Sequence, residues 1–200
     1  MAKKKPQLPL GVLPDLLTWW RRTRVKGVVI GGLAVAFRGR ARTTRDVDAI
    51  IFMDEDQWPA FLKKGEKLSF RPRIPDALDF AMKNRVLLMC HHDTNTEVDL
   101  SLGSLPFERQ VLARAQRVKV GRLAVPFATA EDLIVLKAIA NRPLDLGDID
   151  GVLDRTVDLD LAYVLKHVDE FAEELETPAI MEDLERLLTR HQAKRRKKKN

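Results

Sequence analysis

The chain has 200 residues, of which 45% are hydrophobic and 32% charged, which suits one globular domain or a core with a small helical appendage. Its single cysteine, Cys90, excludes an internal disulfide and is typical of a reducing compartment. No apolar run approaches the roughly 20 residues of a membrane span, and Met1–Lys5 is not followed by the apolar core of a signal peptide, so we expect a cytoplasmic protein with no membrane partner.

The formal charge of +6 is concentrated at the two ends of the chain. Lys3–Lys5 supplies three positive charges and residues 194–199 supply six, with no acid in either segment. The other 26 basic residues face 29 acids, so the body of the chain is slightly acidic. Blocks of like charge are typical of solvated tails, which can also contact nucleic acid. We expect a flexible basic N-terminus over residues 1–10 and a basic tail over residues 191–200, either solubilising or nucleic-acid-binding.

The first predicted elements are a helix over residues 13–24 and a buried strand over residues 28–30, which ends at Gly31 and Gly32. A glycine pair lets the backbone turn sharply and come close to a ligand. If a helix begins within residues 33–37, its first amides point back over the turn, where they favour an anion such as phosphate. The pair is therefore either an ordinary turn or a phosphate-binding turn.

Two aspartates open the next predicted strand, which continues into an apolar run over residues 49–52. Side chains at i and i+2 share one face of a strand, so Asp46 and Asp48 point the same way. Two carboxylates so close repel each other unless a cation lies between them. Hard oxygen ligands suit Mg²⁺.

The middle of the chain is predicted to alternate between helices and strands. Its expected elements are a helix over 54–67, a loop over 71–76, a short helix over 76–82, a strand over 85–90, a strand over 96–102, a helix over 105–116 and short strands over 117–120 and 122–125. The strand over 96–102 alternates cleanly, with Glu97, Asp99 and Ser101 on one face. Such a polar face inside an apolar domain either meets water or lines a site.

The remaining third of the chain is predicted to be helical. Thr129 is a good cap for a nearly all-apolar helix over residues 133–140, within which Lys137 needs either an anion or access to solvent. In the next helix Asp145 suits the N-cap position and Asp148 the first turn. Two amphipathic helices, over residues 159–176 and 178–190, complete the prediction.

The motifs G-G-L-A-V-A-F and R-x-T-x-D-V-D, over residues 31–48, resemble the nucleotidyltransferase superfamily that includes DNA polymerase beta. They look most like the AbiEii-type nucleotidyltransferases, many of which are toxins of bacterial toxin–antitoxin systems. A weaker likeness, E-D-L-I-V-L-K followed by R-P-x-D-x-x-D, covers residues 131–148. Leu33 stands where many members have serine, which removes one phosphate contact.

The resemblance implies a role for each of the residues in these motifs. Asp46 and Asp48 would bind two Mg²⁺ ions, and Asp99, with Glu97 as the alternative, would be a third metal ligand or the general base. Gly31 and Gly32 would cradle the phosphates of a nucleoside triphosphate. By the same resemblance Lys137 would be a catalytic and nucleotide-binding residue, and Asp148 would be a nucleotide-binding residue. Arg42 and Arg45 are further candidates for nucleotide binding.

The sequence therefore predicts an α/β (α+β) protein whose small mixed sheet is flanked by helices and followed by a C-terminal helical part. The expected boundaries are a nucleotidyltransferase core over residues 11–128 and a helical part over residues 129–190. The expected function is Mg²⁺-dependent transfer of a nucleoside monophosphate to an acceptor hydroxyl, with RNA, such as tRNA, as the acceptor and an antitoxin protein as a possible partner. The alternatives are a protein or small-molecule acceptor, or a catalytically idle binding module.

Overall fold

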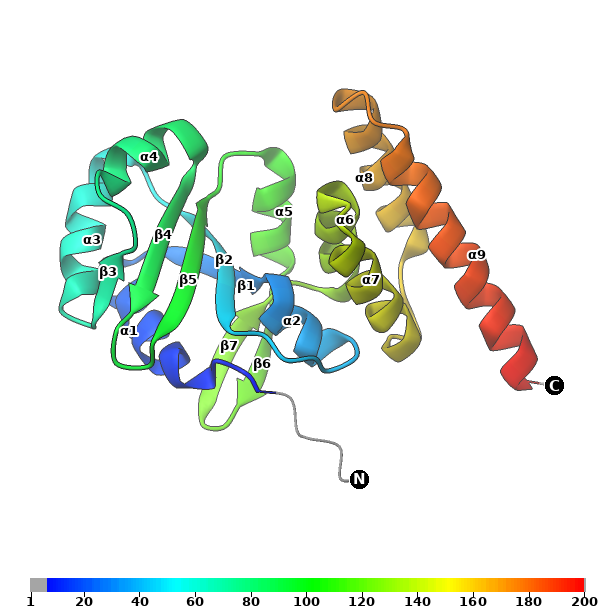
Figure 1. Ribbon diagram of the computed structural model, residues 1–200, viewed down its shortest axis with the longest axis horizontal. Coiled ribbons are helices and arrows are strands. Elements are labelled where there is room, and N and C mark those ends of the chain that lie inside the picture. Colours follow the sequence, from blue (N-terminus) through cyan, green and yellow to red (C-terminus); the bar gives the residue numbers. More distant parts are fainter. Residues whose placement is uncertain (1–6, 200) are drawn as a thin grey trace. The chain divides into compact units, whose positions relative to one another are not determined.

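The computed structural model describes residues 7–199, which form two compact units (Figure 1). Over the described residues, unit 1 consists of residues 7–34 and Arg42–Ala128, and unit 2 consists of Val35–Ala41 and residues 129–199. The predicted flexible N-terminus, residues 1–10, lies outside the described residues over its first six positions. None of the helices in the described part of the chain combines the length and the apolar character needed to cross a membrane.

Unit 1 contains a mixed seven-stranded sheet, which confirms the predicted fold class. Its strands are β1 (Lys26–Ile30), β2 (Asp46–Phe52), β3 (Phe70–Pro72), β4 (Val86–His91), β5 (Thr96–Leu102), β6 (Gln116–Val120) and β7 (Leu123–Phe127). They lie in the order β3-β4-β5-β2-β1-β7-β6. The β2–β5 and β1–β7 pairs are parallel and the other neighbours are antiparallel.

The helices of unit 1 are α1 (Leu13–Thr23), α3 (Trp58–Glu66), α4 (Ala77–Asn84) and α5 (Pro106–Arg114), with short 3-10 turns at Leu10–Val12 and Glu55–Gln57. Helix α2 (Gly31–Arg38) starts in unit 1 and ends in unit 2. The core is anchored by Trp19, whose ring stacks on Phe61 and Phe70 at centroid distances of 4.1 and 4.7 Å. Its indole Nε1 donates to the carbonyl oxygen of Phe61 over 2.9 Å, so this buried polar group is satisfied.

Unit 2 is helical and consists mainly of α6 (Ala130–Ala140), α7 (Pro143–Arg155), α8 (Leu161–Glu174) and α9 (Ala179–Lys199). These four helices pack on one another, and α6 is buried along most of its length, as its apolar sequence predicts. Thr129 caps α6, because its hydroxyl accepts a hydrogen bond from the backbone amide of Asp132.

Three sequence predictions about local structure are wrong. The segment predicted as a loop over residues 71–76 begins inside β3, an edge strand in which Pro72 needs no ladder hydrogen bond on its open side. Asp145 is not an N-cap, because α7 begins at Pro143, a residue whose fixed φ suits a first helical position. Asp148 consequently lies beyond the first turn of α7.

The last helix extends further than the sequence pattern indicated. The amphipathic stripe ends near residue 190, but α9 continues to Lys199. Lysine and arginine are good helix formers, and cations at a helix C-terminus interact favourably with the helix dipole. The basic segment predicted as a tail over residues 191–200 is therefore helical as far as Lys199.

Candidate active site

The turn between β1 and α2 requires glycine at its first position. Gly31 has a φ of +61°, and a Cβ atom added there would lie 1.8 Å from Oδ2 of Asp48. A Cβ atom at Gly32 would lie 2.7 Å from Oγ1 of Thr44 and 2.9 Å from Nη2 of Arg42. The backbone at the start of α2 therefore comes as close to these side chains as a chain without Cβ atoms allows.

Four acidic side chains lie on one face of the β2–β5 pair. In the parallel register Asp46 is opposite Glu97, and Asp48 is opposite Asp99. Residues at i and i+2 of a strand share a face, so the four form a small grid. Val47, between the two aspartates, points to the other face and is completely buried. The structure therefore brings Asp46, Asp48 and Asp99 together in unit 1, beside the glycine turn.

Arg73, which the sequence analysis did not identify, reaches this acidic face. Its guanidinium donates one hydrogen bond to Oδ1 of Asp99 and one to Oε2 of Glu97, the latter over 2.8 Å. Its backbone amide donates to the carbonyl oxygen of Leu88 on β4, which fixes the position of this segment. Burial raises the pKa of the Asp99 carboxyl, and the neighbouring Arg73 opposes that shift. Arg73 is 24 residues from Glu97 in the sequence, so only the fold reveals the pairing.

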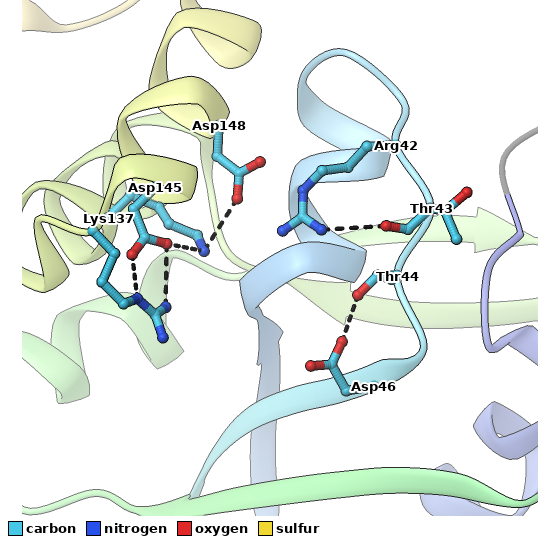
Figure 2. Close-up of polar contacts among 8 residues, drawn as sticks. Arg42, Thr43, Thr44, Asp46, Lys137, Asp145 and Asp148 are labelled. Carbon is cyan, nitrogen blue, oxygen red and sulfur yellow. Dashed lines mark hydrogen bonds and ion pairs between the residues drawn. The ribbon is translucent and has the colours of Figure 1, made fainter.

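The segment before β2 supplies further polar contacts, shown in Figure 2. The hydroxyl of Thr44, which is buried, donates a hydrogen bond to Oδ1 of Asp46. Nη1 of Arg42 donates to the carbonyl oxygen of Thr43 over 3.3 Å. Arg45 is exposed. Thr44 thus orients one of the two predicted metal ligands, a role that only the R-x-T-x-D spacing could have indicated.

The donor chemistry of this face suits Mg²⁺, because carboxylate oxygens are the ligands that this ion prefers. Within residues 7–199, however, no group of three or more His, Cys, Asp or Glu side chains is arranged closely enough to hold a metal ion. Asp46 is hydrogen-bonded to Thr44 and Asp99 to Arg73 instead. The predicted metal ligands are thus close together, and their convergence on an ion stays a prediction.

A second charged cluster lies inside unit 2, around Lys137 (Figure 2). Its ammonium Nζ lies 2.6 Å from Oδ1 of Asp145 and 3.2 Å from Oδ2 of Asp148. All three side chains are at least nine-tenths buried. The anions that compensate Lys137 are therefore two carboxylates of α7, whereas its sequence context predicted solvent or a phosphate.

Asp145 also accepts hydrogen bonds from Arg142. Burial on its own would raise the pKa of the Asp145 carboxyl, but the hydrogen bonds and charges of Arg142 and Lys137 outweigh it and lower the pKa below its ordinary value. Asp145 is therefore ionised at neutral pH. The cluster is a charge-balanced network within unit 2.

Comparison with known proteins supports a nucleotidyltransferase fold. Residues 16–197 match the model of a family described as a nucleotidyltransferase of unknown function, DUF6036. A nucleotidyltransferase-like antigenic protein from Paracoccidioides brasiliensis is similar in structure, with a TM-score of 0.54 and 14% identity over 88% of this chain and 93% of the other. The antibiotic-resistance factor ANT(2'')-Ia is also similar, with a TM-score of 0.58 and 15% identity over 84% of this chain and 92% of the other. None of the curated proteins matches the sequence significantly.

Proposed function

The chain belongs to the family of nucleotidyltransferases of unknown function designated DUF6036, and from this premise we propose that it transfers a nucleoside monophosphate from a nucleoside triphosphate to a hydroxyl group of RNA. The observation that carries this proposal is the register of β2 and β5, which sets Asp48 opposite Asp99. Gly31 lies directly against Asp48. Carboxylates suit a cation, and the amides at the start of a helix suit phosphates. The acidic pair beside the glycine turn therefore places a candidate cation site next to a candidate phosphate site.

In this proposal Asp46 and Asp48 bind Mg²⁺, with Asp99 as a further ligand or as the general base. The metal, when bound, offsets the charge of the triphosphate and of the departing pyrophosphate. The acceptor oxygen forms a bond to the α-phosphorus as the bond from that phosphorus to pyrophosphate breaks. As the base, Asp99 takes the proton of the acceptor hydroxyl, and the burial that raises its pKa makes it a better proton acceptor.

The remaining residues bind the triphosphate. The backbone amides at the start of α2, at Gly31 and Gly32, donate to phosphate oxygens. Arg42 and Arg45 offset negative charge on the same phosphates. The hydroxyl of Thr44 holds the Asp46 carboxylate in place. Leu33 contributes no hydroxyl, so phosphate binding relies on the backbone amides and the two arginines.

Lys137 and Asp148 remain candidates on the strength of the sequence resemblance alone. We propose that Lys137 is the phosphate-compensating lysine of the motif, with Asp145 and Asp148 setting its position. Because both aspartates already balance its charge within unit 2, a lysine variant has to be judged by stability as well as by transfer.

The choice of RNA as acceptor, with tRNA as the test substrate, draws on the basic end of the chain. Arg195, Arg196 and Lys197 are exposed on α9, where they are available to phosphates, whereas the neighbouring Lys194 pairs with Asp150 over 3.1 Å. A role as a toxin, with an antitoxin as protein partner, is the biological setting that the AbiEii-like motifs favour. The similarity to ANT(2'')-Ia concerns the fold and does not select an acceptor. A small hydroxyl compound is therefore tested as an alternative acceptor.

The test is incubation with each α-³²P-labelled nucleoside triphosphate and Mg²⁺, with total bacterial tRNA as the acceptor and, in parallel, with a small hydroxyl compound such as an aminoglycoside. We expect label to move to RNA with the wild type and with Asp79→Asn, which removes an exposed carboxylate on α4. Asp48→Asn should abolish transfer. Label on protein would show that the acceptor is a protein side chain and not RNA. No transfer to any acceptor, by a chain that also fails to bind nucleotide with Mg²⁺, would contradict the proposal and favour an idle binding module.

A further inference from the structure

A cavity of about 770 Å³ lies within unit 1, away from the glycine turn. It is lined by residues of α1 and α5, by the beginning of β1 at Lys26 and Gly27, and by residues of β6 and β7. Strand β1 runs from Lys26 to Ile30, and Gly31 follows at once. At about 3.3 Å per residue the two ends of this strand are separated by roughly 13 Å. The cavity and the candidate active site are therefore at opposite ends of one strand.

The charged side chains that line this cavity are all positive. They are Arg21, Lys26, Arg109 and Arg117, which come from four different elements. Neither aspartate nor glutamate is among the lining residues. All four cations are exposed, and within residues 7–199 none of them forms an ion pair.

The contacts that these four side chains do make leave their charges uncompensated. Nη1 of Arg117 donates to the carbonyl oxygen of Ala124 over 3.4 Å, and the guanidinium of Arg109 lies 5.2 Å from the ring centroid of Phe52. Arg73 and Arg85, in the same unit, are by contrast paired with carboxylates. The cavity thus keeps unpaired cations whose charge an external anion can balance.

The sequence explains this local imbalance in a chain whose body is slightly acidic. No acid occurs between Asp15 and Asp46, a stretch that includes Arg21 and Lys26. None occurs between Glu108 and Glu131, a stretch that includes Arg109, Arg114, Arg117, Lys119 and Arg122. The fold brings these two acid-free stretches together around one cavity, so their positive charges add.

We propose that this cavity binds the phosphodiester backbone of the RNA acceptor while its reacting hydroxyl lies at the glycine turn. The inference rests on the proposed function in one respect, namely that the RNA bound in the cavity continues toward Asp48. Binding of RNA in the cavity does not itself require nucleotide transfer. Four cations from four elements suit an extended polyanion better than a single phosphate, and arginine forks match phosphate oxygens. The apolar lining residues Leu17, Leu112 and Leu123 offer contact to sugars and bases. A polycationic acceptor such as an aminoglycoside would be repelled.

The experiment is titration of fluorescently labelled bacterial tRNA at several KCl concentrations. The variant Arg21→Gln/Arg117→Gln removes two cavity cations, and Lys63→Gln/Lys83→Gln removes two exposed cations from α3 and α4. Each lost phosphate contact lowers the slope of log K against log[salt] by about 0.7 to 0.9. For the cavity variant we expect the magnitude of this slope to fall by about 1.5 and the affinity for tRNA at low salt to fall roughly tenfold. The lysine control should stay near wild type. Arg21→Lys/Arg117→Lys should keep the wild-type salt slope, because it keeps both charges, and lose only part of the affinity, because lysine lacks the planar fork.

A parallel titration with Mg²⁺ and a nucleoside triphosphate separates this inference from the proposed function. Weaker tRNA binding by the cavity variant, with unchanged nucleotide binding and melting temperature, supports the inference. If the cavity variant binds tRNA more weakly but the protein binds no nucleotide, the cavity is still an RNA-binding site, whereas the proposed transferase function is contradicted. Wild type that does not bind tRNA, or a cavity variant no weaker than the lysine control, would overturn the inference.

Discussion

The guanidinium of Arg73 donates a hydrogen bond to Asp99, the carboxylate that lies opposite Asp48 in the β2–β5 register. A second bond from the same guanidinium holds Glu97. A protein cation thus lies on the acidic face where Mg²⁺ is proposed to bind. It lowers the mutual repulsion of the carboxylates, and it would compete with the proposed metal for Asp99.

Removal of this competing cation should strengthen metal binding. In Arg73→Ala the Mg²⁺ concentration that gives half-maximal thermal stabilisation should fall roughly two- to fivefold, because a partly exposed ion pair contributes up to about 1 kcal/mol. The metal-free variant should melt earlier than the wild type. Arg85→Ala is the matched control, since Arg85 pairs with Glu55 in the same unit. A variant that binds Mg²⁺ no better than this control would show that Arg73 does not compete.

Gly31→Ala tests the contact between the turn and Asp48. Two effects are expected: backbone strain of about 1–2 kcal/mol at a φ of +61°, and displacement of the Asp48 carboxylate by the new methyl group. Gly121→Ala isolates the first effect, because Gly121 has a φ of +59° and nothing within 4 Å of an added Cβ. Urea unfolding should show the backbone strain in both variants and a further loss in Gly31→Ala, because its methyl group must also displace Asp48, whereas nucleotide transfer should fall at least about 100-fold in Gly31→Ala alone. Equal transfer by the two variants would be the contrary result.

Lys137→Met should destabilise the protein. It leaves the Asp145 and Asp148 carboxylates buried without their shared cation, and loss of one partner of a buried pair costs about 3–5 kcal/mol. The exposed Lys166, which pairs with Glu170 across one helical turn, provides a control, and Lys166→Met should cost under about 1 kcal/mol. Free energies of unfolding from urea titration decide the matter. A change below about 1 kcal/mol for Lys137→Met would mean that the cluster does not stabilise unit 2.

The lowered pKa of Asp145 makes a prediction about acid stability. Because its folded pKa lies below the ordinary value of 3.8, the unfolded chain takes up this proton first as the pH falls. The stabilisation is therefore complete above the unfolded pKa and is lost as the pH falls toward the folded pKa. Unfolding free energies measured from about pH 6 to pH 3 should decline less steeply in Asp145→Asn than in the wild type. The exposed Asp79→Asn should follow the wild-type slope; identical slopes for all three proteins would contradict the prediction.

The parts of the fold that the sequence predicted are those set by local patterns. The alternation of residues 96–102 identified β5, and Thr129 identified the start of α6. Errors occurred where tertiary context decides. Pro72 indicated a loop, but β3 is an edge strand, which tolerates proline. The apolar stripe ends near residue 190, so it did not predict the last turns of α9.

The candidate site divides in the same way. The i, i+2 spacing placed Asp46 and Asp48 on one face, the family resemblance added Asp99, and the structure sets Asp99 opposite Asp48 on the neighbouring strand. The partners of these carboxylates depend on contacts between distant segments. Arg73 meets Asp99 only because β3 and β4 extend the sheet beyond β5, and periodicity carries no such information.

The central claim is that the acidic face of unit 1 binds Mg²⁺ together with a nucleoside triphosphate. Its most direct test is isothermal titration of the protein with non-hydrolysable analogues of the four nucleoside triphosphates, with Mg²⁺ and with EDTA, in the wild type, Asp48→Asn and Asp79→Asn. We predict Mg²⁺-dependent binding of at least one analogue by the wild type and by Asp79→Asn, and loss of that binding in Asp48→Asn. Absence of Mg²⁺-dependent binding in the wild type, or undiminished binding in Asp48→Asn, would contradict the claim.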